Sequence, residues 1–158
     1  MKKTLVLVAA IIALSTGATA QENIDNPFFK QGYRADIQIR ANTSRQSYIS
    51  TSHGYSFGNG LYLGGGAGVG AEYVPDFSAD ANIVTCVFAD GKYNIANWKL
   101  SPFVAARVGA VLPVETLDQP RFSATASVGV DWGRISISAG YTLQKSMNGA
   151  EFGLGFSF

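Results

Sequence analysis

The sequence predicts an all-β fold, an eight-stranded antiparallel up-and-down barrel, and three observations lead to it. First, apolar and polar residues alternate along eight segments of about ten residues, which is the period of a strand. Second, 47% of the residues are hydrophobic and 18 are glycine, yet beyond the amino terminus no apolar run could span a bilayer as a helix. Third, the final strand has one fully apolar face, which a barrel closed in lipid would cover. We therefore expect a transmembrane barrel.

The first 20 residues have the layout of a cleaved signal peptide. Lys2 and Lys3 form a basic start, residues 5–14 are an apolar run, and Ala18 and Ala20 occupy the small-x-small positions of a cleavage site. The apolar run is shorter than the about 20 residues that a membrane-spanning helix needs. We expect this segment to direct export and then to be removed.

The exported chain is predicted to contain a short leader and one domain. Residues 1–20 are the signal peptide, residues 21–30 form a polar periplasmic leader, and residues 31–158 form the outer-membrane barrel domain. Within the leader, the aromatic pair Phe28 and Phe29 is expected at the membrane interface, where aromatic rings are enriched. No composition break indicates a second domain.

Composition excludes several classes of function. Loss of Lys2 and Lys3 from 12 basic residues leaves the exported chain nearly balanced against 11 acidic ones, so nucleic acid is not an expected partner. Cys86 is the only cysteine, which rules out an internal disulfide. One cysteine and one histidine give no metal-ligand spacing. We expect neither a metal nor a cofactor.

The strands are predicted from period-two alternation. In the first strand, Tyr33 and Ile37 alternate with Arg34 and Asp36. In the second the alternation is weak, and a bulge at Gly54 would switch the facing of its side chains. The predicted strands are residues 31–41, 46–57, 61–73, 81–95, 100–112, 121–131, 134–144 and 151–158.

One predicted face of the third strand is a row of glycines, Gly64, Gly66, Gly68 and Gly70. Their spacing superficially resembles a dinucleotide-binding fingerprint, but no helical period follows them, as that motif requires. In a barrel, such glycines would leave room in a narrow lumen for large side chains from opposite strands.

The predicted connections are alternately longer and shorter. Shorter turns follow the second, fourth and sixth strands, longer ones follow the odd-numbered strands, and residues 113–120 are the longest. In single-chain outer-membrane barrels the short turns lie on the periplasmic side. Both termini are therefore expected to be periplasmic.

Residues 151–158 resemble the carboxy-terminal insertion signal of bacterial outer-membrane barrels. That signal reads polar-x-Gly-x-x-aromatic-x-aromatic, and Glu151, Gly153, Phe156 and Phe158 occupy its four defined positions. The resemblance implies that the barrel-assembly machinery recognises this strand.

Over residues 31–158 the chain resembles the small eight-stranded outer-membrane proteins of the OmpX, OmpW and OmpA-barrel group. The stretches 50–55, 63–66, 88–90 and 100–104 also look like those of porin-like barrels from gut-type Gram-negative bacteria. The resemblance implies an outer-membrane location among lipids and lipopolysaccharide, and we expect a monomer. It implies little about activity, because one fold hosts many functions.

Charged residues on the inward parity are expected to form a network inside the barrel. An eight-stranded barrel encloses only enough space for side chains, and an unpaired buried ion costs at least several kcal/mol. We therefore predict a salt-bridged, filled lumen in which Arg40 meets Glu151 across the closing strands. The alternative is a narrow path for ions or water. The predicted lumen residues are Arg34, Asp36, Arg40, Asp90, Lys92, Arg107, Arg134 and Glu151.

Three functions are compatible with these features. The leading prediction is a structural, membrane-stabilising protein without enzymatic activity, and the second is a narrow porin-like pore for ions or small solutes. The third is a lipid-modifying enzyme that uses His53, the only histidine. Its nucleophile would be Ser50 or Ser52, but these serines lie on the wrong parity or too close in sequence to be partners of His53.

Overall fold

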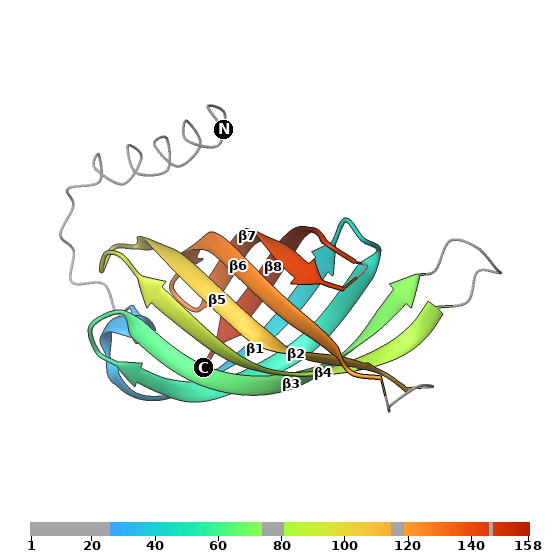
Figure 1. Cartoon of the computed structure of the whole chain (residues 1–158). Helices are drawn as coiled ribbons and strands as arrows, with labels where there is room; N and C mark the ends of the chain where they lie inside the picture. The colour runs from blue at the N-terminus through green and yellow to red at the C-terminus, as the bar shows by residue number, and fades with distance from the viewer. Residues whose placement is uncertain (1–25, 74–80, 115–118, 146) are drawn as a thin grey trace.

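Eight antiparallel strands, each hydrogen-bonded to its neighbours in the sequence, close into one barrel in the computed structural model of the protein (Figure 1). The structure describes residues 26–73, 81–114, 119–145 and 147–158. A short 3-10 helix, η1 (Pro27–Phe29), precedes the first strand. The strands are β1 (Gln31–Asn42), β2 (Gln46–Phe57), β3 (Leu61–Tyr73), β4 (Ala81–Asn94), β5 (Leu100–Pro113), β6 (Arg121–Trp132), β7 (Ile135–Gln144) and β8 (Gly149–Ser157).

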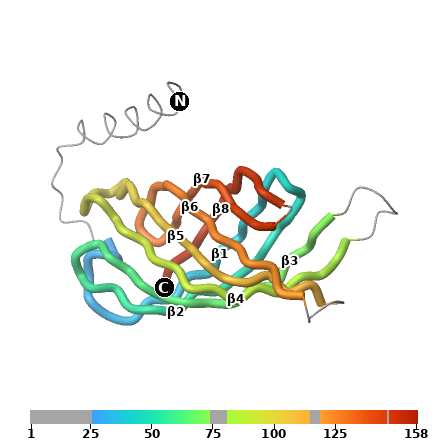
Figure 2. Tube along the Cα trace, in the orientation of Figure 1, coloured from blue at the N-terminus to red at the C-terminus, as the bar shows by residue number. Residues whose placement is uncertain are grey.

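The barrel closes where the last strand meets the first. Ile39 of β1 lies opposite Leu154 of β8. At the end of this seam where β8 finishes, Ala35 and Phe158 exchange backbone hydrogen bonds of 3.2 and 2.9 Å. Figure 2 shows the same closure along the Cα trace, with the red end of the chain beside the blue one. Closure leaves no strand of the sheet with an unpaired edge.

All eight predicted strands are present, and this confirms the predicted all-β barrel. Their ends differ from the predicted ones by no more than two residues. The bulge considered at Gly54 is absent, because the register runs unbroken through this residue, which pairs with Arg34 on one side and Gly64 on the other. The outward facing of β2 therefore stays the same along its whole length.

The connections follow the predicted alternation only in part. Residues 43–45 and 58–60 are both three-residue turns, so the first connection is as short as the one after β2. Arg45 closes the first turn with a positive φ of 63°, a conformation that suits tight hairpins. Residues 95–99, after β4, form a longer turn than either. The assumption that every odd-numbered strand is followed by a longer connection is therefore wrong.

The outer surface of the barrel is an apolar belt. In the described strands every Asp, Glu, Lys and Arg stands on the inward parity. The exposed aliphatic side chains of the belt include Ile37, Ile39, Ile49, Leu63, Val69, Val87, Val104, Val108, Val128, Ile137 and Leu154. Exposed aromatic rings stand toward the strand ends on the side of the termini (Tyr33, Tyr55, Phe57, Tyr93, Trp132 and Phe158) and toward the other ends (Tyr73, Phe122, Tyr141 and Phe152).

Helix η1 closes the barrel end at which β1 begins and β8 ends. Phe28 is 1% exposed, and its ring meets the ring of Tyr62 edge-on at 6.4 Å between centroids. Ser56 Oγ donates to the Phe28 carbonyl oxygen at 2.9 Å. The expectation of an interfacial position is therefore wrong for Phe28, because the ring fills the barrel mouth instead. The predicted signal peptide and its cleavage site, Ala18 and Ala20, lie outside the described residues.

In the part of the chain that the structure describes, no helix has the length and apolar character to cross a membrane.

Candidate functional site

The lumen holds ten charged side chains from the strands, five basic and five acidic. The predicted network contained seven of them. It missed Glu72, Arg121 and Asp131, which stand near strand ends on the inward parity and would have been found by following the alternation to those ends. The ten residues are Arg34, Asp36, Arg40, Glu72, Asp90, Lys92, Arg107, Arg121, Asp131 and Glu151.

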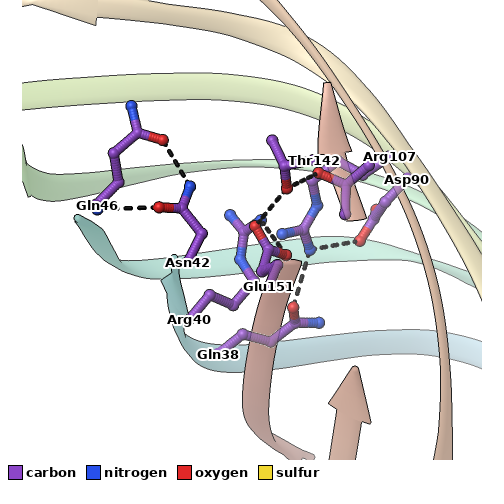
Figure 3. Close-up of polar contacts among 9 residues, drawn as sticks. Gln38, Arg40, Asn42, Gln46, Asp90, Arg107, Thr142 and Glu151 are labelled. Carbon is purple, nitrogen blue, oxygen red and sulfur yellow. Dashed lines mark hydrogen bonds and ion pairs between the residues drawn. The ribbon is translucent and has the colours of Figure 1, made fainter. Parts of the chain in front are cut away.

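The middle of the lumen is occupied by Arg40 and Glu151, the pair predicted from the closing strands (Figure 3). Arg40 Nη1 lies 3.3 Å from Glu151 Oε1, and the two side chains are only 9% and 8% exposed. Thr142 Oγ1 donates to Glu151 Oε2 at 2.9 Å and is itself 2.9 Å from Thr125 Oγ1. The carboxylate is thereby held by a charge and a hydroxyl group, as a buried carboxylate requires.

A second pair lies beside the first. Arg107 Nη2 is 3.3 Å from Asp90 Oδ2 and donates to Gln38 Oε1 at 2.9 Å (Figure 3). Ser52 Oγ donates to the other Asp90 oxygen at 2.8 Å. The Arg107 guanidinium carbon also stands 4.0 Å from the centroid of the Phe88 ring, a favourable cation–π distance.

Lys92 forms a third centre, close to η1. Its Nζ lies 2.7 Å from Asp131 Oδ1, and Asn94 Nδ2 donates to the other Asp131 oxygen at 2.5 Å. The ammonium group also lies 3.9 Å from the Phe28 ring centroid and 4.1 Å from that of Phe103. The two rings cover the charge and separate it from the barrel mouth.

The opposite end of the lumen is held by Glu72 and Arg121. The guanidinium donates to both carboxylate oxygens, at 2.9 and 2.6 Å, in the fork geometry that arginine favours. Gln46 Nε2 donates to Glu72 at 3.0 Å, and Asn42 Nδ2 donates in turn to Gln46 at 2.7 Å (Figure 3). This fourth centre ties β1, β2, β3 and β6 together.

The remaining predicted lumen residues have other contacts. Arg34 donates to the carbonyl oxygen of Pro27, so it anchors η1. Asp36 is buried opposite Ser157 across the closing seam. Arg134 is a correction, because it is exposed in the turn between β6 and β7 and is not part of the lumen. A strand that begins one residue later than predicted leaves its side chain outside.

Two small pockets adjoin the central pairs. One measures about 50 Å³ and the other about 30 Å³. Arg40, Arg107, Thr125 and Glu151 line both, so these side chains stand between the two spaces. A water molecule needs roughly 10–15 Å³ of such volume, so each cavity has room for only a few waters.

The four residues of the insertion-signal pattern divide between the two faces of β8. Glu151 points inward to Arg40, and Gly153 lies where a methyl group would come within 2.6 Å of Ser138 Oγ. Phe156 and Phe158 are exposed on the apolar belt. The pattern therefore combines a lumen contact with two aromatic rings on the outer surface.

His53 faces outward, away from the candidate serines. Ser50 and Ser52 are buried on the inward parity, whereas the imidazole is exposed and its Nδ1 lies 2.6 Å from the Tyr33 hydroxyl oxygen. A serine–histidine dyad of these residues would need both side chains on one face. Among the described residues, no group of three or more His, Cys, Asp or Glu side chains could hold a metal ion.

Comparison with solved structures finds a similar barrel fold. A chain from "De novo design of transmembrane beta-barrels" matches with a TM-score of 0.51 and 15% identity, over 80% of this chain and 94% of that one. The chain shares this fold. The designed protein TMB2.3, solved by solution NMR, has a TM-score of 0.48 and 16% identity, over 85% and 95% of the two chains. No protein-family model and no curated protein matches the sequence.

Proposed function

We propose that the protein is an integral outer-membrane barrel that stabilises the membrane and neither catalyses a reaction nor conducts solutes. The observation that carries the proposal is the filled lumen. The paired side chains Arg40, Glu151, Arg107 and Asp90 cross the barrel interior between two cavities that are too small for more than a few waters.

The apolar belt supports the membrane location. A soluble protein rarely exposes so continuous an apolar surface, whereas acyl chains cover such a belt without cost. Described strands of 9–14 residues are long enough to cross a bilayer at the tilt of a small barrel. The proposed signal peptide, residues 1–20, would export the chain, and residues 151–158 would present it to the barrel-assembly machinery.

The orientation and partners follow from the same features. The element η1 and Phe158 lie at the end of the barrel that carries the turns 58–60, 95–99 and 133–134, so this end is proposed to face the periplasm. The proposed partners are outer-membrane lipids and lipopolysaccharide, with no role for nucleic acid. Because closure leaves no free sheet edge, the protein is proposed to be a monomer.

Planar-bilayer recording of the refolded protein tests the filled lumen. The expected result is no steady conductance above that of the bare bilayer, in samples whose electrophoretic mobility shifts on boiling, as that of a folded barrel does. A steady open level in the wild type would instead support the porin-like pore. A wild-type current that Arg107→Gln alters, in protein that still shows the mobility shift, would place the conduction path in the lumen and contradict the proposal.

Mass spectrometry of the cell envelope tests the absence of enzymatic activity. Lipid A and phospholipids from cells with and without the gene are expected to have the same acyl composition. The outward facing of His53, opposite to that of Ser50 and Ser52, supports this expectation. A lipid species present only in cells that carry the gene, and lost in His53→Gln, would overturn it.

A further inference from the structure

A cluster of polar side chains interrupts the apolar belt on β1 and β2. The Tyr33 hydroxyl group bonds to His53 Nδ1 at 2.6 Å, and Gln31 Nε2 donates to the Tyr55 hydroxyl oxygen at 2.8 Å. All four side chains are exposed on the outer surface. We call these four residues the β1–β2 cluster. None of them contributes to the lumen network.

The hydrogen bond with Tyr33 occupies Nδ1 of His53. In the tautomer in which the Tyr33 hydroxyl donates to Nδ1, the neutral imidazole carries its proton on Nε2. The backbone groups around His53 are already used, because β2 pairs with β1 at Ala35 and with β3 at Gly65. The Nε2–H donor therefore needs an acceptor from outside the protein.

The position of the cluster defines where that acceptor lies. His53 stands four residues before the end of β2 at Phe57, on the side of the termini. At about 3.3 Å per residue and a tilt of about 40°, this places it roughly 10 Å above the barrel edge. Aromatic rings on the same side, including Tyr93 and Trp132, mark the membrane interface. The imidazole thus lies near the boundary between lipid headgroups and acyl chains.

We propose that the β1–β2 cluster is a binding site for the phosphate group of a phospholipid in the periplasmic leaflet. The inference rests on the proposed membrane location. A phosphate oxygen carries negative charge, so a hydrogen bond from a ring N–H to it is charge-assisted and stronger than one to a neutral acceptor. On the β3 side His53 pairs with Gly65, which has no side chain, so a headgroup can approach the ring from that side. Tyr55 and Phe57, in edge-on contact at 5.3 Å, flank the site with apolar surface for the acyl chains.

Solid-state NMR gives a direct test, because the chain has a single histidine and the Nδ1 and Nε2 signals of its one imidazole ring are free of overlap from other histidines. Protein labelled with ¹⁵N-histidine is reconstituted in vesicles of phosphatidylethanolamine and phosphatidylglycerol. The expected result is dephasing of the His53 Nε2 signal by ³¹P, which reports a nucleus within a few ångströms. An Nε2 signal without ³¹P dephasing, in a barrel that has inserted, would overturn the proposal.

Native mass spectrometry measures the contribution of each side chain. Replacing His53 by leucine is expected to weaken retention of phosphatidylglycerol about tenfold, since it removes a hydrogen bond to a charged group. Tyr33→Phe should weaken it less, because the imidazole keeps its place but loses its orientation. Tyr93→Phe, at the same barrel end but outside the cluster, is the matched control and should bind as the wild type does. Equal loss in the control would contradict a defined site.

A lipid without phosphate separates the possible ligands. Competition with monogalactosyl diacylglycerol is expected to leave phosphatidylglycerol bound, and equal competition would show that hydroxyl groups suffice and the phosphate assignment is wrong. If the proposed membrane location is wrong, the result is different: the protein would show no boiling-dependent mobility shift in any vesicle. An inserted barrel with neither dephasing nor retention contradicts only the lipid site.

Discussion

At the scale of single residues, the narrow lumen combines the largest and the smallest side chains. A methyl group on Gly66 would come within 2.7 Å of the Phe88 ring, and one on Gly70 within 2.5 Å of the Tyr48 ring. Large aromatic groups from one strand therefore occupy space that glycines on the next strand leave free. The glycines in β3 make room for large side chains, as predicted, but these rings come from the neighbouring strands β2 and β4 and not from opposite strands.

Replacing Gly66 by alanine tests this packing. The methyl group would collide with Phe88 and, more closely still, with the carbonyl oxygen of Thr51, so the free energy of unfolding should fall by about 1–3 kcal/mol. Gly65→Ala is the matched control, because its methyl group would point outward with only the Phe88 carbonyl oxygen nearby, at 3.1 Å. Urea unfolding in vesicles measures both. Equal stability losses would show that the glycines serve another purpose.

Removal of one charge from the central pair should be far more costly than removal of both. Glu151→Ala leaves Arg40 buried without its carboxylate, which should lower the free energy of unfolding by about 3–5 kcal/mol. The double variant Arg40→Met/Glu151→Leu fills the same space with apolar groups and should recover most of that loss. Equilibrium unfolding of the wild type and the two variants measures both changes in the free energy of unfolding. A double variant as unstable as Glu151→Ala would mean that the pair does more than neutralise charge.

At the scale of the elements, η1 plugs one end of the barrel. Its Phe28 ring reaches Tyr62 and Lys92, and Arg34 holds its backbone at Pro27. The alternation of the leader sequence gives no hint of this, since Phe28 and Phe29 are adjacent and only one of them is buried. Phe28 is the buried ring of the pair because it contacts the Lys92 ammonium group and the Tyr62 ring inside the barrel.

Truncation of Phe28 to alanine should loosen η1 without opening the barrel. The local opening free energy of the helix should fall by about 3 kcal/mol, the lower end of the range for a buried phenylalanine. Hydrogen exchange of the Phe29 amide, bonded to Asn26 at 3.1 Å, should then accelerate. The Ala35 amide in the closing seam should keep its rate. Phe29→Ala, which removes the less buried ring, is the control, and similar exchange in both variants would argue against a specific plug.

At the scale of the whole molecule, the barrel is turned inside out relative to a soluble protein. Ion pairs occupy the interior, and the apolar side chains form the surface. The buried ions do not need water, because each is paired inside the barrel. The apolar belt, in contrast, needs an apolar solvent such as lipid. The energetic cost of placing a charge on the belt should therefore depend on depth.

A depth-dependent pair of substitutions tests the membrane location. Leu154, 58% exposed between Ile39 and Ile137, stands well within the belt, and its replacement by arginine should cost about 2–4 kcal/mol of folding free energy in vesicles. Phe122, 66% exposed one residue from the start of β6, is the control, and Phe122→Arg should cost about 0–1 kcal/mol. Unfolding titrations give both values. A stabilising effect of Leu154→Arg would indicate an aqueous surrounding instead.

The sequence alone determined the strands and their two faces. A strand sends successive side chains to opposite sides, so the alternation of residues such as Ile37 and Gln38 fixes the facing before any contact forms. Even the charge pair of Arg40 and Glu151 could be predicted, because closure of a barrel must bring the first strand against the last. The three missed charges lie inside the predicted strands, near their ends and on the inward parity, but were left out of the predicted network.

Only the tertiary structure decided which charge meets which. The partnership of Lys92 with Asp131, or of Arg121 with Glu72, depends on the stagger between distant strands and on side-chain length across the lumen. The burial of Phe28 depends likewise on a space that does not exist until all eight strands have closed. A local pattern sets the face of each residue, but contacts across the barrel form between residues far apart in the chain, and no periodicity encodes them.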